Sequence, residues 1–185
     1  MPYQILSLLL EVAVGLLGGA CLLRLYMQQQ RIPMGARSGN PLGQFIFALT
    51  DWLVLPLRRV VGSVGRWDIA SLVAAWLLEL LQYLLLWLVI GAGSVGSVLI
   101  LTCFGLVRLA ISGLSALVIV YAVLSWVQTR SPLSDLLERL VAPPLVPIRR
   151  LVPLVGGVDL SPLVLLVLLQ IALIVLGSIQ SMALL

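Results

Sequence analysis

The chain contains no histidine, no lysine and only two cysteines, Cys21 and Cys103. Histidine and clustered thiolates are the usual protein ligands of zinc and other transition metals, so the common metal sites are excluded. The sequence also lacks a Gly-x-x-x-x-Gly-Lys-Ser/Thr phosphate loop and a nucleophile elbow, which leaves only isolated carboxylates for acid–base chemistry. We therefore predict that the protein is not an enzyme, and we expect no catalytic, cofactor-binding or metal-binding residues.

Charged residues are scarce as well. They make up 10% of the 185 residues, whereas 62% of the residues are hydrophobic and the mean hydropathy is +1.19. So few polar groups cannot cover a water-soluble globule. A helix needs roughly 20 apolar residues to cross a bilayer. Four segments satisfy this requirement, at about 5–25, 69–90, 106–127 and 162–184, and they predict an all-α membrane protein with four transmembrane helices.

All the cationic side chains are arginines, and most of them lie in two connections, one before the second apolar segment and one before the fourth. The glycine-rich turn over 91–97 and the C-terminal tail carry none. Arginine and lysine are enriched in cytoplasmic loops of membrane proteins. We therefore expect both arginine-rich connections in the cytoplasm and both termini on the opposite side of the membrane.

Two stretches of the chain, 40–73 and 131–164, align with each other without a gap. Self-similarity of this kind indicates a repeated structural unit. Because each copy joins two apolar segments in the same order, we predict two parallel helical-hairpin repeats, over 1–90 and 106–185. A glycine-rich turn and an apolar connection over 91–105 join them, and its final part either lies in the outer interface or extends a tilted helix.

An Asn-Pro or Ser-Pro pair opens each copy of the repeat, which is a typical helix start because the first side chain caps free amides. We predict short amphipathic helices over about 41–55 and 132–142. Pro56 and Pro147 are expected to end them, since proline lacks an amide donor and clashes with the preceding turn. Such helices are too short to span a bilayer, so they either lie along the cytoplasmic interface or pack over the cytoplasmic mouth of the bundle.

Both copies then continue with a double arginine and an aspartate. These residues form a repeat-signature polar cluster: Arg58, Arg59, Asp68, Arg149, Arg150 and Asp159. The arginines are placed to contact anionic lipid phosphates, and each such arginine near the membrane surface contributes about 1 kcal/mol to the binding free energy. The aspartates precede membrane helices, where a carboxylate caps free amides and meets the positive end of the helix dipole. Alternatively, the aspartates pair with arginines of their own or the opposite repeat.

Three charged residues, Glu11, Glu79 and Arg108, fall inside the predicted membrane helices. Charges at this depth cost about 3 kcal/mol or more, so they are functional candidates. Glu11 shares a helix face with Gly15 and Gly19, a pattern that lets another helix approach closely. We expect Glu11 and Arg108 to form an ion pair that joins the two repeats, because burying either charge alone is costly.

Glu79 lies nearest the middle of its predicted helix, with Gln82 and Tyr83 on the same face. One interpretation is a protonated, hydrogen-bonded carboxyl in a helix contact. The other is part of an ion path or a proton-linked site. Four helices make a narrow bundle, so conduction would require an oligomer in which Glu79 faces a shared axis.

The repeats carry a resemblance. The strings Asn-Pro-Leu…Leu-Thr-Asp…Pro-Leu-Arg-Arg…Gly-x-x-Asp-x-x-Ser over 40–71 and Ser-Pro-Leu…Pro-Ile-Arg-Arg-Leu-Val-Pro-Leu-Val-Gly-Gly-Val-Asp-Leu-Ser-Pro over 131–162 resemble the YggT family of small bacterial integral membrane proteins. The resemblance implies two repeats of two membrane helices in the bacterial inner (plasma) membrane. With the arginine-rich connections in the cytoplasm, both termini are then expected in the periplasm. It also implies a link to osmotic stress tolerance and potassium uptake. It supplies no catalytic residue.

Two functions fit these patterns. A membrane scaffold or assembly factor needs a stable bundle and a cytoplasmic face that partners or lipids recognise, and we consider this first. The alternative is a potassium-flux or osmotic-adaptation component, which Glu79 and the resemblance favour. The expected partners are anionic lipid headgroups and a membrane-protein partner or a second copy of the chain. The arginines are too dispersed to predict direct nucleic-acid binding.

Overall fold

The computed structural model describes residues 2–35, 38–61, 67–91, 94–127, 131–152 and 159–184. Within these ranges the chain forms helices and no strand. The helices are α1 (Pro2–Gln29), α2 (Pro41–Val60), α3 (Ile69–Ile90), α4 (Val95–Val127), α5 (Pro132–Arg149) and α6 (Ser161–Ala183). The predicted all-α architecture is confirmed.

Four of these helices, α1, α3, α4 and α6, are long and apolar enough to cross a membrane, as the composition predicts. Two of them are longer than expected. α1 extends four residues beyond the predicted end at residue 25, and α4 begins at Val95 instead of residue 106. The predicted connection over 98–105 is therefore the beginning of α4. Its apolar residues continue the hydrophobic run without a proline, so the helix does not stop.

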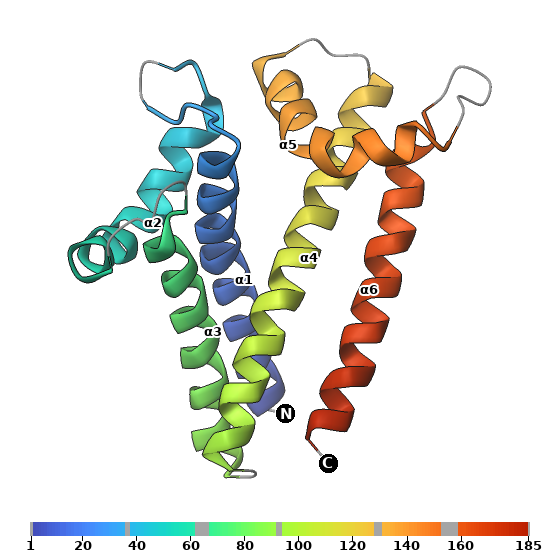
Figure 1. Cartoon of the computed structure of the whole chain (residues 1–185). Coiled ribbons are helices and arrows are strands. Elements are labelled where there is room, and N and C mark those ends of the chain that lie inside the picture. The colour runs from blue at the N-terminus through green and yellow to red at the C-terminus, as the bar shows by residue number, and fades with distance from the viewer. Residues whose placement is uncertain are drawn as a thin grey trace.

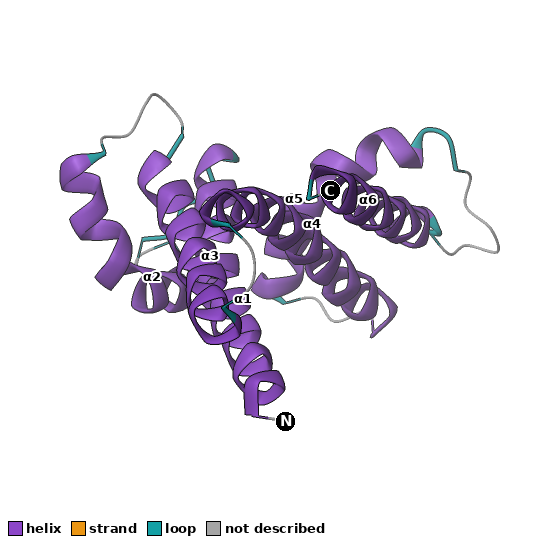
Figure 2. Ribbon diagram, turned by 90° about the horizontal axis from the view of Figure 1, so that it is seen from below, coloured by secondary structure: helices purple, strands orange, loops and turns teal. Residues whose placement is uncertain are grey.

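The four long helices run between two ends of the molecule (Figure 1). Both chain termini lie at one end, and α2 and α5 lie toward the other. α1 packs mainly against α3, and α4 packs against α3 on one side and α6 on the other. Viewed from the end of the termini, α1–α3 and α4–α6 form two neighbouring groups that meet where α3 contacts α4 (Figure 2). We call these groups the first half and the second half.

Side-chain caps explain where α2 and α5 begin. The Asn40 side chain accepts a hydrogen bond from the Leu42 amide at 3.0 Å, and Pro41 occupies the first turn. Ser131 accepts from the Ser134 amide at 3.2 Å within a reciprocal capping box. These contacts satisfy amides that have no partner inside the helix.

The prediction that Pro56 and Pro147 end these helices is wrong. α2 continues through Pro56 to Val60, and α5 continues through three prolines, including Pro147, to Arg149. A proline removes one hydrogen bond and crowds the preceding turn, but a helix can bend there and continue when its two segments are held separately. Both helices change direction along their length (Figure 1).

α2 and α5 each bury one face against the long helices. Ile46 of α2 packs with Met27 of α1 and Leu140 of α5, which joins the two halves at this end of the molecule. Val141 and Leu145 of α5 pack with residues of α4 and α6. Burying a large aliphatic side chain stabilises by roughly 1.5–3 kcal/mol, so these contacts hold both helices on the bundle.

Only part of the apolar surface of α2 is buried in the structure. Ile46 is buried, whereas the side chains of Phe45 and Trp52 are 62% and 60% exposed. α2 therefore packs on the bundle with one side and presents aromatic residues on another.

Candidate functional site

An arginine–aspartate pair occurs at the same place in both halves. In the first half, Arg58 near the end of α2 donates to Asp68 at the start of α3, with Nε 3.2 Å from Oδ1 and Nη2 2.5 Å from Oδ2. In the second half, Nε of Arg149 at the end of α5 lies 2.8 Å from Oδ2 of Asp159, just before α6. Each pair bridges ten residues of chain and ties a bent helix to the long helix that follows it. The aspartates thus contact arginines of their own repeats.

The capping role expected for Asp68 is wrong, although Asp68 does precede the first turn of α3. Its side chain accepts no hydrogen bond from a backbone amide of that turn. The carboxylate instead accepts from Arg58 and from the Ser71 hydroxyl at 2.7 Å. Asp159 differs because its Oδ1 accepts from the Ser161 amide at 2.9 Å, so it contacts the start of α6 while it pairs with arginine.

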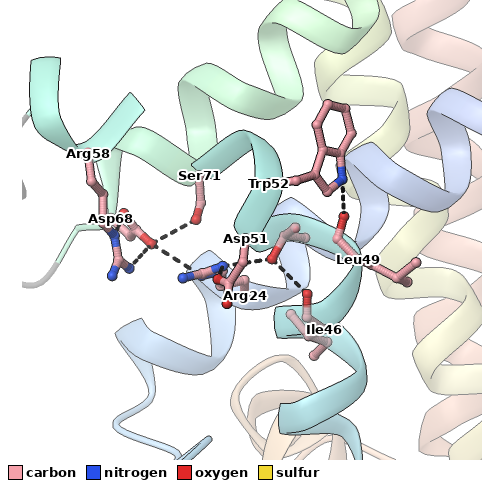
Figure 3. Close-up of polar contacts among 9 residues, drawn as sticks. Arg24, Ile46, Leu49, Asp51, Trp52, Arg58, Asp68 and Ser71 are labelled. Atoms are coloured by element: carbon pink, nitrogen blue, oxygen red, sulfur yellow. Dashed lines mark hydrogen bonds and ion pairs between the residues drawn. The ribbon is translucent and has the colours of Figure 1, made fainter. Parts of the chain in front are cut away.

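The first-half pair belongs to a larger set of interacting polar groups, some buried and some partly exposed, shown in Figure 3. We call this set the first-half cluster: Arg24, Thr50, Asp51, Arg58, Asp68 and Ser71. Arg24 comes from α1, Thr50 and Asp51 from α2, and Asp68 from the start of α3. The cluster therefore links three helices.

Arg24 lies at the centre of this cluster and is 2% exposed. Its Nη1 donates to Thr50 Oγ1 and to Asp51 Oδ1, both at 2.7 Å, and its Nε is 3.7 Å from Asp68 Oδ2. The guanidinium also stacks over the ring of Phe47 at 4.7 Å. Two arginines face two aspartates here, so the formal charges of the cluster balance.

The electrostatics favour an ionised Asp68. Burial alone would raise the pKa of this carboxyl, but hydrogen bonds from Arg58 and Ser71 and the charges of Arg58 and Arg24 outweigh it. The net result is an Asp68 pKa below its ordinary value. Hydrogen bonding to Asp68 is the largest influence on Arg58 and raises the pKa of that guanidinium. Both groups remain charged at neutral pH.

The second-half pair is simpler and more open. Arg149 donates to Asp159 and, through Nη2, to the Tyr121 hydroxyl at 2.7 Å. The side chains of Arg149 and Asp159 are 35% and 29% exposed, against 1% for Asp68. Ala142 stands where the first copy has Asp51, so a second acid is missing.

The remaining arginines of the predicted polar cluster, Arg59 and Arg150, are exposed. No ion pair within the described ranges includes either of them. Each follows an arginine that is paired with aspartate. The double arginines therefore divide their roles between an internal contact and a free guanidinium at the surface.

The predicted Glu11–Arg108 ion pair is absent from the described part of the chain. Arg108 Nη2 instead donates to Gln180 Oε1 of α6 at 2.6 Å. The reason is the packing, since α1 lies mainly against α3 and contacts α4 less extensively. Both Glu11 and Arg108 are exposed on the isolated chain.

Gly15 and Gly19 are expected to let another helix approach closely, but no helix in the described part of the chain packs closely on them. A methyl group added at either position would meet no atom within 4 Å. Both glycines line an apolar groove of about 660 Å³ between α1 and α4, to which Gly113 and Leu117 contribute from the opposite wall.

Glu79 is only 6% exposed and lies against α4. A Cβ at Gly105 would collide with Glu79 Oε2 and would lie 2.8 Å from the ring of Tyr83. Since Glu79 points into the helix contact, it does not face outward toward an oligomer axis, and that part of the alternative interpretation is wrong. No side chain in the described segments donates a hydrogen bond to its carboxyl.

Sequence reasoning missed Arg24, Thr50, Asp51 and Ser71 as members of the site. Arg24 lies outside the aligned repeat, so self-similarity could not identify it. The available signal was the difference between copies, because the first copy has Asp51 where the second has Ala142, which marks a charge found in the first half alone. The formal charges of the first-half cluster sum to zero, and its two carboxylates, of Asp51 and Asp68, already accept hydrogen bonds from arginines. The cluster is suited to fixing helices, and in the described residues no three His, Cys, Asp or Glu side chains gather to hold a metal ion.

The CCB3/YggT family model matches residues 3–89 and 100–180 of this chain. A Vibrio alginolyticus relative, described as an uncharacterized protein in the proC 3′ region, is 38% identical over 162 residues, or 85% of each chain. The Escherichia coli (strain K12) protein YggT, also described as uncharacterized, is 34% identical over 171 residues, which cover 90% of this chain and 86% of the relative. No solved structure matches the chain.

Proposed function

The chain belongs to the CCB3/YggT family, and from this premise we propose that it is a scaffold or assembly factor of the bacterial inner (plasma) membrane without a reaction of its own. The four apolar helices anchor it in the bilayer. α2 and α5 then act as platforms for lipids or a membrane-protein partner. The proposal rests above all on one observation, the arginine–aspartate pair built into both halves.

The pair suits a platform because it fixes orientation. A helix with internal prolines is not held straight by its own hydrogen bonds. Tying its last turn to the next long helix determines the direction of its second segment. The first-half cluster adds a link to α1 through Arg24, so α2 is held on two helices.

The surface of these platforms suits an interface between membrane and water. α2 exposes Phe45 and Trp52, and tryptophan is typical of the headgroup region. The exposed guanidiniums of Arg59 and Arg150 are available for anionic headgroups, each worth about 1 kcal/mol near the surface. We infer that α2 and α5 lie at the cytoplasmic interface.

The proposal also includes the orientation of the chain in the membrane. The arginine-rich connections favour a cytoplasmic end for α2 and α5. Both termini lie at the other end (Figure 1), which would then be periplasmic. Each half would run outside to inside and return, as two parallel repeats.

A photo-crosslinking amino acid tests the platform role directly. We would place it at Phe45 of α2, which is 62% exposed, and at Leu163 of α6, which is 59% exposed, as the matched control. The scaffold role predicts a defined protein adduct in cells from position 45 and lipid adducts alone from position 163. Equal adducts at the two positions would contradict it.

The alternative, a potassium-flux or osmotic-adaptation component, is favoured by the carboxyl of Glu79 at the middle of α3. Reconstitution of the full chain in liposomes separates the two functions. The scaffold role predicts no potassium flux above that of empty vesicles. Selective flux that Glu79→Leu abolishes would support the alternative and contradict the scaffold role.

A further inference from the structure

Glu79 is a buried acid that the scaffold role does not use. It lies at the midpoint of the apolar segment Ile69–Val89 and is 6% exposed. Its carboxyl sits in the contact between α3 and α4, in space that Gly105 leaves by having no side chain. An alanine in place of Gly105 would put a methyl group in the space that the Glu79 carboxyl occupies. The site is therefore built by the packing of two long helices.

The surroundings of this carboxyl supply charge but no hydrogen bond. The charged groups that act on Glu79 are Arg108 of α4, which favours the carboxylate, and Glu11 of α1, which opposes it. Tyr83 of α3 is the neighbouring titratable group on its own helix. In the described segments no donor reaches the Glu79 oxygens, and Arg108 is directed to Gln180 of α6. Two carboxylates and one guanidinium would leave a net charge of −1 within the bilayer.

An ionised carboxylate without a hydrogen bond is among the costliest groups to bury in hydrocarbon. A proton removes that cost, because the neutral acid needs far less solvation. An ion pair with Arg108 would also lower the cost of burying the carboxylate, but in the structure Arg108 donates to Gln180 instead. Arg108 lies one helical turn from Gly105, about 4.5 Å along α4 at 1.5 Å per residue, so its long side chain has Glu79 within reach.

We propose that Glu79 is an intramembrane proton-binding site and that Arg108 exchanges partners when the proton leaves. With the proton bound, the neutral carboxyl packs on Gly105, and Arg108 holds Gln180 of α6. When the O–H bond breaks, one proton passes to water and the carboxylate draws Arg108 toward α3. The ligand is a proton, and its release weakens a contact between α4 and α6. This inference goes beyond the scaffold role and does not rest on it.

Infrared difference spectroscopy between neutral and alkaline pH tests proton binding, with the full chain in vesicles of ether-linked lipids, which have no ester carbonyl. The wild-type protein should show the carbonyl band of a protonated carboxylic acid at neutral pH, and alkaline solution should remove it. Glu79→Gln should eliminate the band, since glutamine imitates the neutral acid in shape and preserves the fold. Glu11→Gln, a matched change on α1, should retain it. Absence of the band at neutral pH, or its persistence in Glu79→Gln, overturns the proposal.

Partner exchange needs a separate measurement. Spin labels at Val95 of α4 and Met182 of α6, both exposed, report the separation of the two helices in a variant without the native cysteines. We expect the distance distribution to change between neutral and alkaline pH, and to stay constant in Glu79→Gln and in Arg108→Gln. A wild-type distribution that is the same at both pH values, or a change that survives in Glu79→Gln, overturns the exchange.

Discussion

At the scale of single residues, Arg24 is the group on which the first-half cluster depends. Its guanidinium is buried and is surrounded by Thr50, Asp51 and Asp68. A charge at this depth is stable only when opposite charges and hydrogen bonds surround it. One side chain of α1 therefore holds α2 and α3 in fixed positions.

Arg24→Gln is expected to destabilise the folded protein by about 3 kcal/mol, because it leaves Asp51 and buried Asp68 short of a countercharge. Arg149→Gln is the matched control in the second half. Its pair is partly exposed, and such pairs contribute about 1 kcal/mol or less. Denaturant unfolding in detergent measures both. Equal losses for the two variants would contradict the importance assigned to Arg24.

Asp68 makes stability depend on pH. Its pKa in the folded protein is below the ordinary carboxyl value, so its contribution is complete above about pH 4, the unfolded value, and is lost as the pH falls through the folded value. We expect the melting temperature to fall on acidification in this window, and Asp68→Asn to flatten that dependence. An unchanged pH profile in Asp68→Asn would show that other carboxyls are responsible.

The sequence predicts part of this site. Arg58, Asp68, Arg149 and Asp159 stand out because both copies of the repeat keep them. Arg24 does not, since an arginine near the end of an apolar segment usually extends to the headgroups. Only the packing of α1 against α2 shows that it points inward.

At the scale of helices, α2 and α5 show how tertiary contacts override a local signal. Proline at positions 56 and 147 predicts a helix end from its local chemistry. Each helix instead bends and continues, because its first segment is buried by apolar contacts and its last turn is tied to an aspartate. The existence of the helices is predictable from apolar length, and the starts of α2 and α5 are predictable from their capping pairs, whereas the start of α4 at Val95 is not. The ends depend on contacts with distant residues.

Gly43 controls how α2 is attached. A Cβ at this position would collide with the backbone of Met34, in the connection that precedes the helix. Gly43→Ala is expected to lower the free energy of unfolding by about 1–3 kcal/mol, because the backbone at Met34 would have to move. Gly15→Ala serves as the control, since a methyl there meets no atom within 4 Å. Thermal unfolding compares them, and equal stability of the two variants would contradict the close approach.

At the scale of the whole molecule, the two halves meet where α3 packs on α4 and where α2 packs near α5. Each half has its arginine–aspartate pair at the junction between its bent helix and the long helix that follows, and α2 and α5 lie toward the end of the molecule opposite the termini (Figure 1). Length and hydropathy predict the number of long helices. They do not predict the groove between α1 and α4 or the neighbours of Arg108, because side-chain packing between helices decides these.

We predict that both arginine–aspartate pairs lie on the cytoplasmic side of the membrane. Single cysteines at Val60 and Leu151 test it, because these are equivalent positions of the repeat and are 84% and 83% exposed. Met182→Cys and Ser94→Cys mark the opposite end. All four variants are prepared without the native cysteines and are treated in intact cells with a membrane-impermeant maleimide.

We predict that Met182→Cys and Ser94→Cys react in intact cells, whereas Val60→Cys and Leu151→Cys react only after the membrane is permeabilised. Reaction of either Val60→Cys or Leu151→Cys in intact cells would contradict the cytoplasmic placement of the two pairs.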